Sequence, residues 1–455
     1  QGWDVSSVRD LSSTFESSFQ EVGFSADLSS WKFQPQPWFC LDATFARIPK
    51  FTGKISGWNL LAKGPAISED DEVSSSARGT GVYIHRLLEE TNVYSGEISD
   101  WSIVSEAKDA EIGVLCSRVL EGTDLIEGVV SNMELRGESH TDSGGVLQEK
   151  PVGVLVDRLA IGSQDISGDL SNWKLTGVAE TSTRSSGVLV TNQLFAVTTM
   201  LGRIKEWELD GKANAPEDPV GVGIEGFLDF AMEVDGDISS WILKGEATNG
   251  QDGNLINGVE LRDCFYDIAK LSGSIRSWDI TGSVNSSLSV GGSGVAIGPP
   301  ESTPGAFVRS CGDVSADFGS WRVVGNIVNP TGPEADPGPS GVNIKNLFNE
   351  LTGNFTGSIS DWDVRGVAII GRNWGYGIDI DGVLNEWYGG SYNGTANDIE
   401  LTGKVFGQGG PEPHGVRVTS LLTGGTPTLI SQECKGWKVD GSVVNTASDG
   451  GAIAV

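Results

Sequence analysis

Apolar residues along this chain follow a recurring pattern that ends, at a constant distance, on a tryptophan. Segment 81–101 (GVYIHRLLEETNVYSGEISDW) begins with Gly-Val, continues through the apolar pair Leu87 and Leu88, and ends on Ile-Ser-Asp-Trp. The same Gly-to-Trp distance of 20 residues recurs in segments 153–173, 187–207, 221–241 and 258–278, and in 113–133 with Met in place of Trp. A constant internal spacing is typical of a repeat array in which each unit forms one layer of a solenoid.

The repeat continues over the whole chain, so we predict a single array over residues 1–455 without an internal domain boundary. The interval between successive unit ends averages about 37 residues, which lies within the usual range for structural repeats. The predicted units end near Trp31, Trp58, Trp101, Met133, Trp173, Trp207, Trp241, Trp278, Trp321, Trp362, Ile399 and Trp437.

Each unit is expected to contain two short strands separated by a polar loop of variable length. The motif Trp-x-ϕ-x-Gly, as in 173–177, alternates apolar and polar positions as a half-buried strand does. Gly-Val-x-ϕ predicts the second strand, and the apolar pair after it predicts one or two short helical turns. The fold class that follows is a right-handed β-solenoid, leucine-rich-repeat-like, with about twelve layers spanning roughly 60 Å.

Charge narrows the range of partners. The chain has 31 basic and 61 acidic residues, a net charge of −30. Such a surface repels nucleic acid and anionic membranes, and is better suited to cations, to basic surfaces or simply to solubility. No apolar run approaches the 18 or so residues of a membrane-spanning helix, and no signal-like segment follows Gln1, so no membrane insertion is expected.

Short segments around the tryptophans resemble a known family. Segment 3–15 (WDVSSVRDLSSTF), together with 27–31, 98–101, 169–173, 237–241 and 359–364, is similar to the BspA-like surface-protein repeat, roughly D-I/L-S-x-W-D-V-S. That family is leucine-rich-repeat-like, and the resemblance implies an extracellular protein of the cell surface associated with adhesion. After the first unit, long loops replace the Ser-x-Val that follows Trp-Asp-Val in the family, so the resemblance implies the fold more than a particular partner.

Candidate catalytic and metal-binding chemistry is sparse. The three histidines lie in different units, without Cys or carboxylates at metal-ligand spacing, so we predict no metal site and no cofactor. Asp379-Ile380-Asp381-Gly382 resembles the start of a calcium loop but lacks its closing Glu; the alternatives are weak surface calcium binding and an edge strand with outward-facing Asp side chains. Because acidic residues occur throughout, carboxylate pairs mark no catalytic site, and an enzyme is not expected.

Cysteines and sequons give two further expectations. Five cysteines leave at least one unpaired. Cys264 and Cys311 each lie six residues after the glycine taken to start the unit, Gly258 or Gly305, so adjacent layers would bring them within disulfide distance. Three sequons predict N-linked glycans, at Asn285, Asn354 and Asn393.

The tryptophan column is expected to be a buried stack, whereas aromatic residues outside it are candidates for an interface. These candidates are Trp374, Tyr376 and Trp387. The ends of the array are a second candidate: the chain enters within a unit at Trp3 and Val5, and leaves on a strand-like segment at Ile453 and Val455. Either the chain is part of a longer array, or copies stack head to tail into a filament.

Three functions are therefore compatible with the sequence. The first is a glycosylated extracellular structural protein that forms a cell-surface filament or matrix as a head-to-tail homopolymer. The second is a monomeric adhesion module that binds a partner through its variable loops. The third is a polysaccharide-active enzyme, since solenoid folds include such enzymes.

Overall fold

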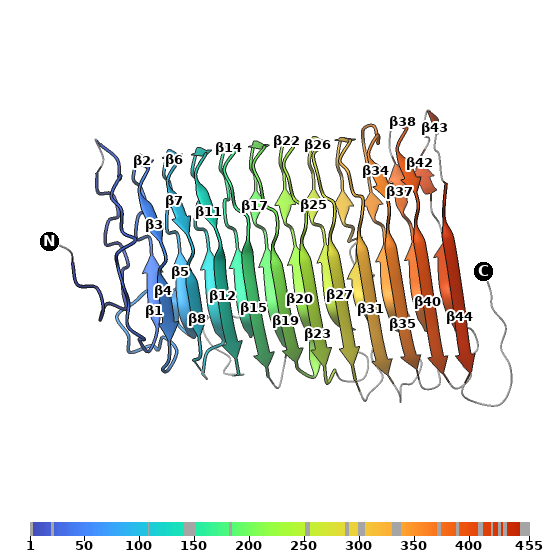
Figure 1. The fold of residues 1–455 in the computed structure, drawn as a ribbon, viewed down its shortest axis with the longest axis horizontal. Helices are drawn as coiled ribbons and strands as arrows, with labels where there is room; N and C mark the ends of the chain where they lie inside the picture. Colours follow the sequence, from blue (N-terminus) through green and yellow to red (C-terminus); the bar gives the residue numbers. More distant parts are fainter. Residues whose placement is uncertain are drawn as a thin grey trace.

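The computed structural model is a parallel β-solenoid, and Figure 1 shows its turns stacked along the long axis from the N-terminal to the C-terminal end. Each strand pairs in parallel with the corresponding strand of the next turn, as β13 does with β16. The structure describes residues 3–19, 22–107, 109–140, 151–181, 184–250, 255–286, 291–298, 305–329, 338–370, 375–387, 391–407, 413–419, 422–425, 429–430 and 435–445.

Two long sheets of eleven strands each form the broad faces of the solenoid. Sheet I consists of β1 (Phe39–Asp42), β5 (Thr80–His85), β9 (Ile112–Ser117), β13 (Val152–Asp157), β16 (Arg184–Thr191), β20 (Glu217–Glu225), β24 (Leu255–Arg262), β28 (Gly291–Ile297), β32 (Ser340–Lys345), β36 (Tyr376–Asp381) and β41 (His414–Thr419). Sheet II consists of β4 (Asn59–Ala62), β8 (Ser102–Ser105), β12 (Met133–Ser139), β15 (Trp173–Glu180), β19 (Glu208–Asn214), β23 (Ile242–Thr248), β27 (Asp279–Asn285), β31 (Arg322–Asn329), β35 (Asp363–Ile370), β40 (Glu400–Gly407) and β44 (Lys438–Asn445).

Short strands form the remaining sides. Sheet III consists of β2 (Lys50–Phe51), β6 (Val93–Tyr94), β10 (Leu125–Ile126), β14 (Asp165–Ile166), β18 (Thr199–Met200), β22 (Glu233–Val234), β26 (Lys270–Leu271) and β30 (Asp313–Val314). Sheet IV consists of β17 (Leu194–Phe195), β21 (Leu228–Asp229), β25 (Phe265–Tyr266), β29 (Val308–Arg309), β33 (Phe348–Asn349), β37 (Leu384–Trp387) and β42 (Leu422–Gly425). Smaller sheets join β3 (Lys54–Ser56), β7 (Glu97–Ser99) and β11 (Val129–Ser131); β34 (Ser358–Ser360) and β39 (Thr395–Asn397); and β38 (Ser391–Tyr392) and β43 (Leu429–Ile430).

The predicted helical turns are wrong. Within the described residues the only helical segment is a 3-10 turn, η1 (Ser75–Ala77). At the Leu87-Leu88 pair the backbone bonds to the next turn instead of to itself, because Leu88 N–H donates to Val119 O at 2.7 Å. Left-handed residues on either side, Arg86 (φ 51°) and Glu90 (φ 53°), bend the chain around the core.

The long sheets also have eleven strands where about twelve layers were predicted. The first turn explains the difference, because it contributes isolated bridges to its neighbour instead of full strands. These bridges are Asp10↔Cys40, Phe24↔Phe51, Asp27↔Lys54 and Gln36↔Ala62.

The tryptophans form the predicted buried stack. Neighbouring rings lie nearly parallel, with centroids 4.9 to 5.1 Å apart along Trp58–Trp101 and along the run from Trp173 to Trp362. Each indole N–H also donates to a backbone carbonyl of the previous turn; Trp241 Nε1, for example, donates to Ile204 O at 2.6 Å. The indole is therefore both a large apolar group and the partner of a carbonyl that the core would otherwise leave unpaired.

The residue immediately before each tryptophan position has a left-handed backbone, so the chain turns sharply into sheet II. Its φ lies between 53° and 71° in eleven turns. These residues are Gly57, Asp100, Asn132, Asn172, Glu206, Ser240, Ser277, Ser320, Asp361, Asp398 and Gly436. Asn, Asp and Gly adopt this conformation more readily than other residues, which accounts for much of the set.

Two columns of glycine bring sheets I and II into direct backbone contact. A Cβ on Gly177 of sheet II would lie 1.9 Å from the carbonyl oxygen of Gly187 in sheet I. The same approach, 1.8 to 2.0 Å, recurs at Gly137, Gly211, Gly245, Gly282, Gly325, Gly366 and Gly403. These glycines divide the interior into the main core and a smaller apolar cluster that includes Ile256, Val284 and Ile327.

The predicted Cys264–Cys311 disulfide is wrong. Both thiols are free and buried. Gly258 packs against Gly294, not Gly305, so the layer after Gly258 begins eleven residues earlier than predicted. Phe265 is in register with Val308, so Phe307 lies opposite Cys264, and Cys311 lies four residues further along its own turn, beyond the bend at Ser310.

Candidate functional site: a hollow on sheet I and its corner

The outer face of sheet I carries a column of side chains that is interrupted at one turn. The column passes through Leu155, Leu189, Gly223, Glu260 and Ala296, which are in register on successive strands. These positions alternate with core residues such as Val222 and Ile224, so they point outward. Gly223 has no side chain, and a Cβ there would lie 2.9 Å from Cδ1 of Leu189 and 3.6 Å from Cγ1 of Val220. The missing side chain leaves a hollow.

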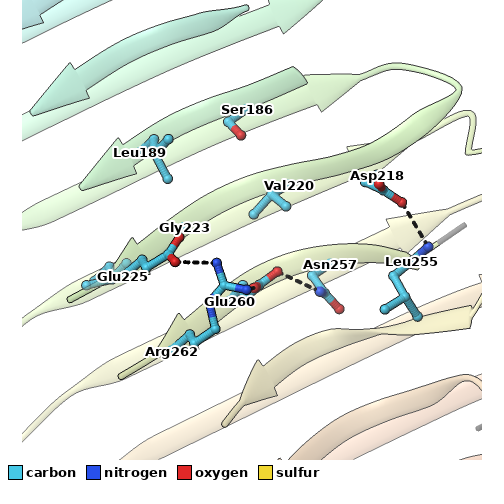
Figure 2. Close-up of a pocket in the computed structure, with 11 residues that line it drawn as sticks. Ser186, Leu189, Asp218, Val220, Gly223, Glu225, Leu255, Asn257, Glu260 and Arg262 are labelled. Atoms are coloured by element: carbon cyan, nitrogen blue, oxygen red, sulfur yellow. Dashed lines mark hydrogen bonds and ion pairs between the residues drawn. The ribbon is translucent and has the colours of Figure 1, made fainter. Parts of the chain in front are cut away.

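The hollow is a cavity of about 250 Å³ over β16, β20 and β24, and Figure 2 shows it extending along the strands. Leu189, Val220 and Leu255 give it an apolar lining. Glu225, Glu260 and Arg262 lie toward the end where β20 and β24 finish, and Asp218 lies at the opposite end beside Leu255. The full lining is Ser186, Leu189, Asp218, Val220, Gly223, Ile224, Glu225, Leu255, Asn257, Glu260 and Arg262.

The polar end of the hollow is held by its own hydrogen bonds. Arg262 lies 2.5 Å from a carboxylate oxygen of Glu225, and Asn257 donates to Glu260 at 2.8 Å. Burial alone would lower the pKa of Arg262, but the facing carboxylates of Glu260 and Glu225 outweigh it and raise that pKa. Arg262 is therefore a fixed cation that is already paired within the site.

At the corner between β20 and β21, two side-chain oxygens converge over a glycine. Gly226 has a φ of +60°, and a Cβ there would lie 2.8 Å from Asp229 Oδ2 and 2.9 Å from Asn192 Oδ1. Any other residue would be both strained and obstructed here, so only glycine fits beneath these two oxygens. Glu225, at the end of the hollow, immediately precedes this corner.

Asp229 is the least satisfied charged group of this region. Its side chain is 92 % buried, since its relative exposure is 8 %, and its Oδ1 has no hydrogen-bond partner within the described residues. Burial raises the pKa of Asp229 to about 7, with a further contribution from the neighbouring carboxylates of Asp263 and Glu225. Burial likewise raises the pKa of Asp263. The arginines nearby are used elsewhere: Arg262 with Glu225, and Arg309 with Glu350 at 3.0 Å.

Aromatic rings of sheet IV and the following bend flank this corner on three successive turns. Phe195 and Phe230 meet edge to face at 5.1 Å, and Phe230 meets Tyr266 in the same way at 5.2 Å. Asp229 is in register with Tyr266, so the carboxyl belongs to the same column. The guanidinium of Arg309 lies 5.4 Å from the centre of the Tyr266 ring.

Phe230 is unusual in both its exposure and its backbone. It is 44 % exposed, and its φ of 58° lies in the left-handed region that bulky residues avoid. At the corresponding bend the three preceding turns have Gly122, Gly162 and Ala196, and the turns before them have Arg47 and Glu90. A strained, exposed aromatic ring is a combination that points to contact with another molecule.

Of the aromatic residues predicted to form an interface, Tyr376 is not available for contact with a partner. It is 5 % exposed, stacks on His414 with ring centres 5.7 Å apart, and lies under the guanidinium of Arg417 at 4.0 Å. The prediction failed because the strand β36 begins at Tyr376 and lies between two other strands of sheet I. Trp374 lies outside the described residues, and for Trp387, on β37, the structure describes the backbone alone.

The candidate calcium residues are likewise occupied. Asp379 is 1 % exposed and pairs with Arg417, whose Nε lies 2.7 Å from Asp379 Oδ1. Asp381 accepts a hydrogen bond from Thr419 Oγ1 at 2.9 Å. The two Asp side chains face outward, as one of the two alternatives expected, but β36 is an interior strand of sheet I and not the expected edge strand. In the described part of the chain, no group of three or more His, Cys, Asp or Glu residues is placed to hold a metal ion.

All three predicted glycosylation asparagines are exposed. Asn285 is the last residue of β27. Asn354 and Asn393 lie on neighbouring turns, but the carboxamide of Asn354 already bonds Asp313 Oδ1 at 3.1 Å and the backbone N–H of Ser391 at 3.0 Å. Glycan attachment at Asn354 would replace one hydrogen of the amide nitrogen that donates to Asp313.

The predicted assembly residues differ in exposure. Trp3 is 65 % exposed and stacks on Trp31 at 6.0 Å, whereas Val5 is buried in the core. Ile453 and Val455 lie outside the described residues. No helix among the described residues is long and apolar enough to cross a membrane.

Comparison with known proteins covers only the start of the chain. Residues 1–66 match the family described as "Mycoplasma protein of unknown function, DUF285". No curated protein and no solved structure matches the chain. The match covers the first two repeat units and carries no function, and the BspA-like resemblance is not confirmed. The hollow and its corner lie beyond the matched residues, so their role has to be argued from their own geometry.

The sequence drew attention to none of Gly223, Gly226 or Asp229. A signal was present, because aligning the units places Gly223 where other turns carry Leu155, Leu189 or Glu260. Nothing in the sequence indicated Asp229, because the raised pKa of Asp229 depends on its burial and on the nearby carboxylates of Asp263 and Glu225.

Proposed function

We propose that this chain is a rigid scaffold that binds a partner protein on the flank formed by the sheet I hollow and the sheet IV aromatic rings. The single observation that carries the proposal is the cavity at Gly223, because it is a concave site with an apolar lining and a polar end. The adjoining exposed ring of Phe230 extends this site around the corner. This is close to the binding module expected from the sequence, with the flank in place of the variable loops.

A protein partner of basic character fits best. Glu225, Glu260 and Asp263 surround the site while Arg262 alone is cationic at its polar end, and the whole chain carries a net charge of −30. Opposite charge accelerates encounter and selects partners. The aromatic rings supply the large contact surfaces that dominate protein interfaces.

The test is selection of peptides from a displayed library with the full chain as bait. Gly223→Leu fills the hollow, and because its one close contact is with the flexible tip of Leu189 we expect it to fold. Lys174→Leu places the same side chain on the exposed face of sheet II and is the matched control. Selected peptides should bind the control and lose binding to Gly223→Leu. Equal binding to both variants, or ligands found only on a glycan array, would contradict the proposal.

End-to-end assembly into a filament is a second candidate, supported by the exposed Trp3 at the head of the tryptophan stack and by the exposed Val439 and Val444 on β44. Stacking of another copy on Trp3 would continue the ladder and cover these residues. Electron microscopy and sedimentation at increasing concentration test it. Wild-type filaments that Trp3→Ser abolishes would support assembly, and a monomer at all concentrations would argue against it.

An extracellular, glycosylated setting at the cell surface belongs to the same proposal. It is supported by the exposure of Asn285, Asn354 and Asn393. Mass spectrometry of material from the native source, before and after enzymatic removal of N-glycans, should show mass changes at these asparagines. Unmodified peptides covering all three would contradict it.

A further inference from the structure

The corner of β20 and β21 brings acceptor oxygens together over Gly226. Asp229 Oδ2 and Asn192 Oδ1 both point at the space over Gly226, and Asp229 Oδ1 has no partner among the described residues. A buried carboxyl of this kind costs free energy unless a donor or a cation reaches it. Arg262 and Arg309 are engaged by Glu225 and Glu350, so neither of these two arginines is a free cation for Asp229.

The surroundings select the kind of donor. Asp263 and Glu225 add negative charge, which favours a cation over a neutral donor. The rings of Phe230 and Tyr266 on the flank favour a cation that is flat and weakly hydrated, because such a group stacks on aromatic faces. A guanidinium meets both conditions, and it can donate to two carboxylate oxygens at once.

We propose that an arginine side chain of the partner protein enters this corner and pairs with Asp229 beside the rings of Phe230 and Tyr266. The inference rests on the proposed function and specifies the chemistry of its partner. Lysine would satisfy the charge but neither the bidentate geometry nor the stacking, so it binds more weakly. The corner recognises one residue, while the hollow at Gly223 takes the segment next to it.

The test uses the full chain labelled with 3-fluorotyrosine, which gives one fluorine signal for each of its 6 tyrosines. The fluorine signal of Tyr266 is assigned by its absence from the spectrum of the Tyr266→Phe variant. The probes are acetyl-Gly-Gly-Arg-Gly-Gly-amide and two counterparts with Lys or citrulline in the central position. Citrulline keeps the shape of arginine and removes its charge. We expect the Arg peptide to shift the Tyr266 signal saturably, the Lys peptide to do so at higher concentration, and the citrulline peptide to leave it unchanged.

Two variants complete the experiment. Asp229→Asn keeps the shape of the side chain and should lower the affinity for the Arg peptide by at least about tenfold, as expected for loss of a charge-assisted pair. Asp440→Asn removes one charge from the exposed face of β44 and should leave binding unchanged. Circular dichroism and thermal unfolding confirm that both variants fold.

Three results would overturn the inference: no shift of Tyr266 at millimolar Arg peptide, an equal shift with citrulline, or equal weakening in both Asp variants. The last would mean a general attraction to an acidic surface. Failure here is distinguishable from failure of the proposed function. If library peptides lose binding to Gly223→Leu but bind Asp229→Asn as well as the wild type, the proposed function stands and only the arginine contact is contradicted.

Discussion

At the scale of single residues, Asp229 links stability to pH. Its pKa is raised to about 7 by burial first, and then by Asp263 on the bend after β24 and Glu225 on β20, with Arg262 as the cation of the same corner. A folded-state pKa above the unfolded value means that the native state binds the extra proton. The stabilisation is therefore complete below the pKa of the unfolded chain, 3.8, and is lost as pH rises through about 7.

This gives the first prediction. As pH rises from 5 to 8, the melting temperature of the wild-type chain should fall relative to that of Asp229→Asn, because the carboxyl of Asp229 ionises and the amide of the variant cannot. The limiting slope for one proton is about 1.4 kcal/mol per pH unit. Thermal unfolding of both proteins at each pH measures it, and Asp440→Asn should instead follow the wild type. A constant difference between Asp229→Asn and wild type across this range would show that Asp229 does not titrate there.

A second residue-scale prediction concerns the bend before the tryptophans. Glu206 adopts a φ of 60°, which costs an L-residue about 1 kcal/mol relative to glycine. Glu206→Gly should therefore raise the melting temperature slightly, even though glycine usually destabilises strands and helices. Lys174→Gly, at an exposed position inside strand β15, is the contrasting control and should lower it. Destabilisation by both variants would show that the bend is not strained.

At the scale of elements, the tryptophan stack holds consecutive turns together. Trp241 is fully buried between Trp207 and Trp278, with ring centres 5.0 and 4.9 Å away, and donates its indole N–H to Ile204 O. Trp241→Leu removes both stacking contacts, leaves that carbonyl unpaired and opens a cavity, so we expect a loss of about 3–5 kcal/mol.

Met133 provides the control for this third prediction, because it occupies the same column without an indole. Met133→Leu conserves volume and should cost less than about 1.5 kcal/mol. Denaturant unfolding followed by tryptophan fluorescence compares the two variants. Similar losses in both would mean that the column contributes through apolar volume alone, and that stacking and the indole hydrogen bond add little.

At the scale of the whole molecule, each turn contacts mainly its two neighbours, so stability and length are nearly additive over turns. Deleting 208–241 joins Trp207 to Ile242 in register with the next strand of sheet II. This removes one complete turn. The shortened chain should remain folded and be about 4.8 Å shorter by small-angle scattering.

The same deletion removes Gly223, Gly226 and Asp229, so the fourth prediction is that peptide binding is lost while the fold persists. Deleting 134–173 instead joins Met133 to Lys174 and removes a different turn. That control should shorten the chain equally and retain binding. Loss of binding in both deletions would place the site elsewhere, and unfolding of both would show that the turns are not independent.

The repeat and its core were readable from the amino-acid sequence because they depend on local spacing. A tryptophan recurring 20 residues after Gly-Val predicted one layer per unit, and the tryptophans do stack. The recurring glycine of the Trp-x-ϕ-x-Gly motif could also be recognised in the sequence, but the structural reason for it could not. That reason is the backbone contact of the two long sheets, which involves residues such as Gly177 and Gly187 from separate strands.

Register between turns was decided only by the tertiary structure. Loops of variable length separate the units, so a glycine at 305 could be mistaken for the strand glycine at 294, and the cysteine pairing failed with it. The same applies to exposure: Tyr376 is covered by Arg417, and Asp229 is buried beside other carboxyls. Local periodicity determined which residues form the core of each turn, whereas the hollow and its unpaired carboxyl exist only where three particular turns meet.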